Sequence, residues 1–524
     1  MIDALRSIIK LHPPDPQRQH SPASSLNPAN NSAVVLKQSN NPLVFPLEGR
    51  RMDRGALRGK EMVMTTLQQG TINTFRGQFG GPVFEPKDAG YHEARQIWNA
   101  MIDRKPALIA QCHSVEDVVA AVNFGRDQSM LVSVKGGGHN IAGNAVCNDG
   151  LMIDLSQMKD VEVDVEKQRA FVGPGCTLAD FDAAAQVHGL ATPLGINSTT
   201  GVAGLTLGGG FGWLSRKFGM TVDNLISADM VTADGRQTRA SATENPDLFW
   251  GTRGGGGNFG IVTRFEFQLH PVGPELLSGL MVFPFKQARS VLTQFARFTE
   301  IMPDELNVWL VIRHAPPLPF LPESVHGEPI VALAICYAGD PEVGEQLIAP
   351  LRSFGDAHGE HVGVQPYANW QQAFDPLLAD GARNYWKSHN FVKLTDDVIR
   401  VALEYGGKLP SPHCEIFIAS IGGQTGRVAH DAMAYSSRDA NYVMNVHGRW
   451  ETPGEDEHCR QWARAFFDAA KPYASGGAYI NFLSHDETDR VEFAYGAAYK
   501  RLVEVKQKYD PENLFRVNQN IRPR

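Results

Sequence analysis

From about residue 105 onward, apolar residues recur along the chain with two regular periods. Alternating or wholly apolar runs of about four to eight residues predict strands. Helices are predicted after Ser114 and Thr177, because each hydroxyl is followed three residues later by an acid, which is a helix N-cap signal. Gly189 ends the second helix. The predicted strands and hairpins span 107–112, 131–134, 151–155, 161–165, 169–172, 228–240 and 261–269. This order predicts an α+β domain with mixed sheets that ends near residue 272.

Pro271 and Pro274 separate this region from a second one with longer elements. Its predicted strands are 277–285, 307–313, 330–337, 386–393, 415–420 and 442–446, and its predicted helices are 287–300, 341–354, 396–405 and 457–469. This pattern predicts an antiparallel sheet with helices on one face. In the last piece of the chain, 478–482 is predicted as a strand and 494–508 as a helix.

The chain therefore divides into four parts. Residues 1–62 form an extension, 63–272 a first domain, 273–475 a second domain, and 476–524 a closing segment. The extension is rich in Ser, Asn, Pro, Gln and Arg and cannot bury enough apolar surface to offset its ordering entropy, so we expect it to be disordered. A transit peptide is the alternative interpretation.

Composition narrows the classes of function. Of the 524 residues, 43 % are apolar and 20 % are charged, as in ordinary soluble globular proteins. The net charge of −8 disfavours nucleic acid as a partner, because phosphate contacts need a basic surface. No apolar run reaches the ~18 residues of a membrane span, so no membrane partner is expected. None of the six cysteines forms a C-x-x-C pair or has zinc-ligand spacing, which predicts free thiols, no metal site and a reducing, cytoplasmic compartment.

Glycine is the one residue type in excess, and much of it lies in three short runs, at 136–138, 201–212 and 254–260. Glycine lets the backbone approach a ligand closely, and consecutive backbone N–H groups form concave anion sites. Three such runs in one domain favour a site for a diphosphate-bearing cofactor over simple tight turns. No G-x-G-x-x-G opens a helix after the first predicted strand, and no P-loop pattern is present, which disfavours NAD-type and P-loop folds.

Three segments resemble the FAD-linked oxidases of the vanillyl-alcohol oxidase and p-cresol methylhydroxylase (PCMH) superfamily. Lys135-Gly-Gly-Gly-His139-Asn140 is similar to the R-G-G-G-H motif, and 193–271 is similar to the rest of the FAD domain. Tyr479-Ile-Asn481 and 509–521 resemble the C-terminal segment of berberine-bridge-enzyme-like members of the bacterial 6-hydroxynicotine-oxidase-like kind. The resemblance covers residues 64–524. It implies a two-part FAD-binding domain of PCMH type and a substrate domain whose antiparallel sheet is covered by helices.

The resemblance also implies that FAD is bonded covalently, from His139 to the flavin 8α-methyl group. A histidine with an unperturbed pKa of ~6.5 is neutral and nucleophilic at cytosolic pH. Lys135 stands where arginine is usual and keeps the charge without the bidentate fork. A tightly bound but non-covalent FAD is the alternative. The implied cofactor contacts are Lys135, Gly136, Gly137, Gly138, His139, Asn140, Gly143, Ser198, Thr199, Thr200, Gly201, Gly204, Gly208, Gly209, Gly210, Gly212, Ile261, Tyr479, Asn481, Asn518 and Asn520.

Many members of the superfamily hold the flavin by a second bond, from a cysteine just before the segment that matches Ser198-Thr-Thr-Gly. Asn197 occupies that position here. Cys176 lies earlier, at the start of a predicted helix, and is interpreted as structural. We therefore predict a single covalent link.

Tyr479 is the leading catalytic candidate, since the tyrosine of the similar Y-x-N segment lies beside the flavin and acts as a base or orients the substrate. Packing against the flavin without proton transfer is the alternative. In some relatives the base is a Glu or Gln on a strand, and the matching residue here is Asn445, which cannot be a general base at neutral pH. Tyr442 is included with Tyr479 and Asn445 as a catalytic candidate, and His447 and Tyr385 as possible neighbours of the substrate.

Together these features predict an FAD-dependent oxidase. It would pass hydride from a small alcohol, amine or sugar-like substrate to FAD, and O2 would be the electron acceptor that becomes H2O2. A dehydrogenase with another acceptor and a non-catalytic flavin-binding protein are the alternatives.

Overall fold

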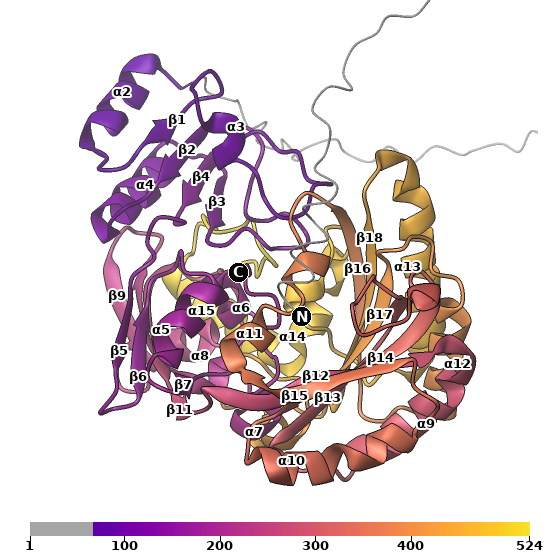
Figure 1. The fold of residues 1–524 in the computed structure, drawn as a ribbon. Helices are drawn as coiled ribbons and strands as arrows, with labels where there is room; N and C mark the ends of the chain where they lie inside the picture. Colours follow the sequence, from indigo (N-terminus) through magenta and orange to yellow (C-terminus); the bar gives the residue numbers. More distant parts are fainter. Residues whose placement is uncertain (1–66) are drawn as a thin grey trace, which may run out of the picture.

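A computed structural model of the chain describes residues 67–524, and the predicted extension 1–62 lies outside the described residues. Figure 1 shows two lobes side by side, with the C-terminal part of the chain packed between them. Among the described residues, the first lobe contains three sheets, of four, five and two strands, and the second contains one large sheet.

The first sheet of the first lobe has the strand order β1-β2-β4-β3. Strands β2, β4 and β3 run parallel, and β1 pairs antiparallel to β2. As predicted, the Ser114 hydroxyl caps a helix, and it accepts a hydrogen bond from the backbone N–H of Asp117. The helix buries Val118, Ala121 and Val122 against the sheet. The elements of this part are α2 (Gln69–Gln78), β1 (Val83–Phe84), α3 (Tyr91–Ala94), β2 (Leu108–Gln111), α4 (Val115–Asp127), β3 (Val132–Lys135) and β4 (Leu151–Asp154).

The second sheet of this lobe is antiparallel, in the order β5-β6-β10-β8-β9. The capping box predicted at Thr177 is present, since Thr177 and Asp180 exchange both hydrogen bonds. Gly189 follows this helix with a φ of 63°. The elements are β5 (Val161–Asp164), β6 (Arg169–Val172), α5 (Leu178–Gln186), β7 (Leu190–Ala191), α6 (Val202–Leu207), α7 (Ser215–Phe218), β8 (Leu225–Val231), β9 (Gln237–Ser241), α8 (Pro246–Thr252), β10 (Ile261–Gln268) and β11 (His270–Pro271).

The second lobe is a seven-stranded antiparallel sheet in the order β15-β12-β14-β13-β17-β18-β16. Figure 1 shows α9, α12 and α13 on its outer face, away from the first lobe. Alternation on β13 explains the two faces: Val308 and Leu310 join the core under the helices, whereas Trp309 points to the first lobe. The elements are β12 (Glu275–Pro284), α9 (Ala288–Thr299), β13 (Leu306–His314), β14 (Pro329–Tyr337), α10 (Pro341–Ile348), β15 (Gly359–Pro366), α11 (Tyr367–Gln371), β16 (Arg383–Phe391), α12 (Asp396–Gly406), β17 (Glu415–Ser420), β18 (Tyr442–Trp450) and α13 (Asp456–Ala470).

The closing segment departs from the prediction. Residues 478–482 are not a strand: Ile480–Phe482 is a single 3-10 turn, because the segment bonds to the glycine run of the first lobe instead of to a sheet edge. Helices α14 (Val491–Tyr495) and α15 (Tyr499–Tyr509) follow. The ammonium group of Lys506 on α15 is fully buried and reaches the Asn258 carbonyl at 2.8 Å, which ties this segment to the first lobe.

The predicted α+β fold, with a two-part first domain and a helix-covered antiparallel sheet, is confirmed. Across residues 67–524, no helix has both the length and the apolar character that crossing a membrane requires.

Candidate active site

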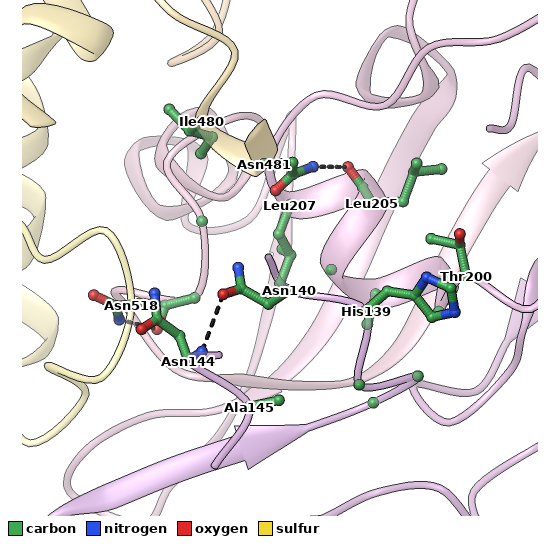
Figure 2. A pocket seen from close by; sticks show the side chains of 18 of the residues that line it. His139, Asn140, Asn144, Ala145, Thr200, Leu205, Leu207, Ile480, Asn481 and Asn518 are labelled. Carbon is green, nitrogen blue, oxygen red and sulfur yellow. Dashed lines mark hydrogen bonds between the residues drawn. The ribbon is translucent and has the colours of Figure 1, made fainter. Parts of the chain in front are cut away.

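A cavity of about 300 Å³ lies where the three parts of the chain meet. Its walls come from the loop after β3, from α6 and the loop before it, from the third glycine run, from the inner face of the large sheet and from the closing segment. Figure 2 shows His139, Asn140, Thr200, Leu205 and Asn481 around this space. The cavity is within the size range of ligand and cofactor sites.

The loop that follows β3 presents bare backbone to the cavity. In the described part of the chain, no acceptor receives a hydrogen bond from the backbone N–H groups of Gly137, Gly138, His139 or Asn140. Successive free N–H groups of this kind form an anion-binding concavity. The first two glycine runs also touch, since a Cβ on Gly137 would lie 2.4 Å from the nitrogen of Gly201. Only glycine fits at these two positions, so close packing of the backbone explains why both runs are rich in glycine.

His139 is the nucleophile candidate, and its surroundings keep it neutral. Its Nε2 lies 2.9 Å from the Thr199 hydroxyl, and its ring stacks on Trp98 at a centroid distance of 5.1 Å. Burial, together with the positive charge of Arg449, lowers the pKa of His139 to about 3. The imidazole therefore keeps a free lone pair throughout the physiological pH range.

Tyr479 lies in the cavity wall with its hydroxyl oxygen already engaged. The oxygen accepts hydrogen bonds from the Gly210 backbone N–H at 3.0 Å and from Asn481 Nδ2 at 3.1 Å. Burial raises the pKa of Tyr479 to about 12. Asn481 also donates to the Leu205 carbonyl, as Figure 2 shows. The phenol is consequently a fixed, protonated group and a poor proton acceptor.

Aromatic side chains from the large sheet close the opposite side of the cavity. Trp309, Trp386 and Phe417 project from three different strands, and Phe482 meets Trp386 edge-on at 5.4 Å. Such walls hold flat, apolar groups well.

One charged cluster interrupts this apolar surface. The Glu415 carboxylate accepts a hydrogen bond from Arg313 Nη1 at 2.7 Å and lies 3.0 Å from His447 Nδ1. All three side chains are buried. Burial alone would raise the pKa of Glu415, but the positive charge of Arg313 and the hydrogen bond from His447 hold it at about 2.

The structure brings most of the predicted cofactor residues to the cavity wall. They are Gly136, Gly137, Gly138, His139, Asn140, Thr200, Gly201, Gly204, Ile261, Tyr479, Asn481 and Asn518. The third glycine run adds Gly256, Gly257 and Gly260.

Other predicted cofactor residues lie behind this wall. The Lys135 ammonium donates a hydrogen bond to the Ala94 carbonyl at 2.9 Å and lies 3.7 Å from the Asp154 carboxylate. Its charge is therefore paired with a carboxylate on β4 of the first sheet. Ser198 bonds to Asp375. Thr199 supports His139 from behind. The remaining members of this set are Gly143, Gly208, Gly209, Gly210, Gly212 and Asn520.

The glycines among them are needed for packing. A Cβ on Gly208 would lie 2.2 Å from Asn481, and a Cβ on Gly212 would lie 1.8 Å from the Leu194 carbonyl oxygen. These glycines therefore let the closing segment and the neighbouring loop approach, which shapes the cavity from behind.

Two catalytic candidates lie away from the cavity. Tyr442 lies on the helix-covered face of the large sheet, where its hydroxyl is 2.6 Å from the Thr299 hydroxyl, so it does not reach the cavity. Asn445 is fully buried on β18 and does not line the cavity either. His447, two residues further along the same face, does line it. Neighbouring residues on a strand face opposite sides of the sheet, which explains why Tyr442 lies away from the cavity. Tyr385 also lies in the helix-side core.

The sequence analysis missed the aromatic residues of the site. Trp98 precedes the first predicted element and belongs to no motif, and Trp309 and Trp386 lie on strands whose facing direction depends on the assembled sheet. Alternation would have paired Trp309 with Val311 on one face, but it does not say which face meets the cofactor.

None of the six cysteines lines the cavity, and all six are buried. Cys176 is fully buried, with its Sγ 3.6 Å from the Asp160 carbonyl oxygen. Asn197 does line the cavity. In residues 67–524 no group of three or more His, Cys, Asp or Glu side chains is arranged to hold a metal ion.

The residues present fit a flavin dinucleotide. The free N–H groups of the loop at 137–140 suit a diphosphate, the apolar and aromatic walls suit a flat ring system, and the neutral His139 suits an electrophilic carbon. Asn518 adds a buried Oδ1 that has no partner within the described residues. A bound polar ligand would supply the missing donor.

Comparison with known families agrees with this fit. Residues 106–241 match the family described as FAD binding domain, and residues 478–522 match the family described as berberine and berberine like.

Similarity to individual proteins extends over most of the chain. An FAD-linked oxidoreductase of Dictyostelium discoideum is 32 % identical over 458 residues, which is 86 % of this chain and 97 % of the relative. The (R)-6-hydroxynicotine oxidase of Paenarthrobacter nicotinovorans is 30 % identical over 467 residues, or 84 % of this chain and 97 % of the relative. The crystal structure of 6-hydroxy-D-nicotine oxidase from Arthrobacter nicotinovorans superposes with a TM-score of 0.77 at 28 % identity, covering 85 % of this chain and 98 % of the other. A xylooligosaccharide oxidase from Myceliophthora thermophila, in complex with xylobiose, superposes with a TM-score of 0.76 at 26 % identity, covering 87 % and 99 %.

Proposed function

The chain belongs to the berberine-bridge-enzyme-like family of FAD-linked oxidoreductases, and from this membership we propose that it is an oxidase with covalently bound FAD. In the proposed reaction a small organic alcohol, amine or sugar-like molecule loses two electrons and two hydrogens, and O2 gains them as H2O2. The observation that carries the proposal is one cavity that combines free loop amides, a neutral histidine and an aromatic wall. When bound, FAD supplies the two-electron acceptor that no protein side chain provides.

Hydrogen bonding supports a covalent role for His139. Asn197 Oδ1 accepts from the backbone N–H of Thr199 and, at 2.7 Å, from its hydroxyl. The only hydroxyl proton of Thr199 is thereby committed, so its oxygen accepts from His139 Nε2. The imidazole proton therefore lies on Nε2, and Nδ1 carries the lone pair.

We assign the flavin attachment to Nδ1. His139 would hold the flavin through a bond from Nδ1 to the 8α carbon; that carbon would lose one hydrogen with two electrons, and the imidazole would lose one proton. O2 takes the electrons and both hydrogens as H2O2, so the step needs no reagent beyond the proposed acceptor. A second link has no support, since no cysteine lines the cavity and Asn197 has no nucleophilic sulfur.

The aromatic wall and Tyr479 have different roles in substrate binding. The aromatic wall of Trp309, Trp386 and Phe417 holds and orients the substrate and excludes water. The Tyr479 hydroxyl is fixed by the donors from Gly210 and Asn481, so it keeps the adjacent wall rigid and holds its proton at neutral pH.

A panel of alcohols, amines and sugars mixed anaerobically with the purified protein tests the activity. We expect at least one compound to bleach the visible flavin absorption, and readmitted air to restore it with one H2O2 formed per substrate oxidised. Bleaching that air does not reverse, but that an added electron acceptor such as a quinone does, would instead identify a dehydrogenase with another acceptor. A flavin that no compound bleaches would identify a non-catalytic flavin-binding protein.

A further inference from the structure

A second, smaller chamber opens beside the cofactor cavity. It has a volume of about 70 Å³, and Ile196, Trp309, Leu378, Phe417 and His447 line both spaces. At about 10–15 Å³ for one water, the chamber has room for about five water-sized groups, close to the size of a small ring. The two spaces therefore share a wall, and His447 lies in that wall.

The walls of this side chamber are almost entirely apolar. Side chains such as Leu280, Val311, Leu318, Ile330 and Phe374 surround it. Its ionisable lining residues are His447, Glu415 and Arg313, which form the buried cluster described above. A molecule with many hydroxyl groups would leave most of them without partners here, whereas a flat hydrocarbon body would lose nothing.

Within that cluster, one nitrogen of His447 is available to a ligand. The Glu415 carboxylate only accepts hydrogen bonds, so the proton of the neutral imidazole lies on Nδ1 and the lone pair lies on Nε2. Nε2 is buried and has no partner among residues 67–524. The ring is fixed by stacking on Trp386 at 4.1 Å and by edge contact with Phe417 at 5.1 Å.

The charges around His447 suit a base. Burial lowers the pKa of His447, and the hydrogen bond to Glu415 opposes that effect, so the ring is neutral and unprotonated on Nε2 at pH 7. Arg313 on β13 and Arg449 on β18 are the cations that face it, and Glu415 on β17 is the anion. When a proton arrives, the carboxylate next to Nδ1 stabilises the new positive charge. Tyr479 lacks such a counter-charge.

We propose that His447, held in place by Glu415, takes the hydroxyl or amine proton of a flat, mainly apolar substrate whose body occupies the side chamber. This inference rests on the proposed oxidase function and narrows it to aryl or similar alcohols and amines. Arg313 and Glu415 act as positioning residues, since they fix the tautomer and orientation of the histidine.

Two bonds of the substrate break in this reaction. The substrate O–H or N–H bond breaks, its electron pair forms the C=O or C=N bond, and the proton goes to Nε2 of His447. FAD, when bound, would supply the acceptor for the hydrogen and two electrons that the adjacent carbon loses, and O2 would finally take them. His447 releases its proton again, so one alcohol or amine and one O2 give one carbonyl or imine and one H2O2.

The substrate class is tested first, with the wild-type holoprotein under anaerobic conditions. The probes are 4-methoxybenzyl alcohol, 4-methoxybenzylamine and cellobiose. We expect at least one aryl probe to bleach the flavin and cellobiose to leave it oxidised. Bleaching by cellobiose or another sugar alone would overturn this inference and leave the oxidase function standing. If no compound of any class bleached the flavin, both would fail.

The base is tested with His447→Gln, using the aryl probe that bleaches the wild type faster. We expect flavin reduction at pH 7.5 to slow by about 100-fold or more, the usual share of a general base, while probe affinity changes far less. The wild-type rate of flavin reduction should fall as pH drops below the pKa of His447. This fall is the acid limb of the pH–rate profile, and the variant should lack it. His389→Gln is the matched control, because His389 is buried on the same sheet but bonds to the Phe467 carbonyl instead of lining the cavity.

A second variant shows whether Glu415 acts on His447 or has only a structural role. Glu415→Gln keeps an acceptor for Nδ1 but removes the counter-charge, so the pKa of His447 should fall and the acid limb should move to lower pH. A purely structural role would not move that limb. If His447→Gln bound flavin normally and reduced it within threefold of the wild-type rate with the same pH profile, His447 would not be the base.

Discussion

The two sides of the cavity are encoded in different ways. The cofactor side consists of contiguous glycine runs, whose backbone amides make the site and whose missing side chains allow Gly137 and Gly201 to touch. The substrate side consists of single side chains on separate strands, such as Trp309, Phe417 and His447. A backbone site tolerates almost no change in its glycines, whereas a side-chain site can be altered one residue at a time. This difference lets one fold keep FAD while its substrate changes.

The largest effect is expected from a variant that disrupts the close backbone contact between Gly137 and Gly201. Gly137→Ala places a Cβ 2.4 Å from the Gly201 nitrogen, so the two loops must separate. We expect loss of bound flavin and a decrease of about 1–3 kcal/mol in the free energy of unfolding. Flavin content after purification and urea denaturation measure both. Gly363→Ala on β15 is the control, since Gly363 does not line the cavity and its Cβ would meet no protein atom within 4 Å, so this variant should keep flavin and unfold like the wild type. Equal behaviour of the two variants would contradict the comparison.

On the substrate side, the contribution of the buried Glu415 carboxylate to the free energy of unfolding should decrease at acid pH. The pKa of Glu415 is about 2 in the folded protein, below its ordinary value of 4.5, so its stabilisation is full above pH 4.5 and is lost as pH falls toward 2. Replacement by glutamine should lower the free energy of unfolding by about 3 kcal/mol at pH 6 and by less than half of that at pH 3.

Urea denaturation of the wild type and Glu415→Gln across that range measures the difference. Glu404→Gln is the control, because Glu404 pairs with Lys408 at the surface and should change little at any pH. A difference for Glu415→Gln that stayed constant from pH 6 to pH 3 would contradict the assigned charge state.

The smallest kinetic effect is expected for Tyr479→Phe. Because its hydroxyl keeps its proton and mainly accepts from Gly210 and Asn481, flavin reduction should slow less than about tenfold, below the usual share of a general base. Stability should fall by about 1–3 kcal/mol, since the Gly210 N–H loses its acceptor. Tyr442→Phe makes the same change on the opposite face of the large sheet, away from the cavity, and should leave the rate unchanged. A loss of rate in Tyr479→Phe as large as that in His447→Gln would return the role of base to Tyr479.

The sequence predicted the elements whose signals are local. Strands with clear alternation, such as β10, and helices with N-cap signals, such as α5, are present where they were expected. The half-exposed strand β15 was missed, because its polar and glycine positions carry no strong pattern. The local pattern of residues 478–482 predicts a strand, but hydrogen bonds to the distant Gly210 and Leu205 override that local preference.

The residues of the site also divide into those within one local motif and those brought together by long-range contacts. His139 and the glycine loops lie in one motif each, so their position follows from the sequence. The wall of Trp98, Trp386 and His447 combines residues from distant parts of the chain: sheet register pairs Trp386 with His447, and Trp98 contacts Trp386 from the first lobe. Tyr442 and His447 lie on the same strand yet face opposite sides, which sequence alone did not resolve.

The central claim is that a single bond from His139 holds the flavin. Acid precipitation of wild-type protein, Cys176→Ala and His139→Ala, followed by peptide mass mapping, tests it directly. The account predicts a yellow pellet for the wild type and for Cys176→Ala, with the flavin mass on the peptide that contains His139. For His139→Ala, any bound flavin should pass into the supernatant. A colourless wild-type pellet, or flavin mass on any other residue, would contradict the account.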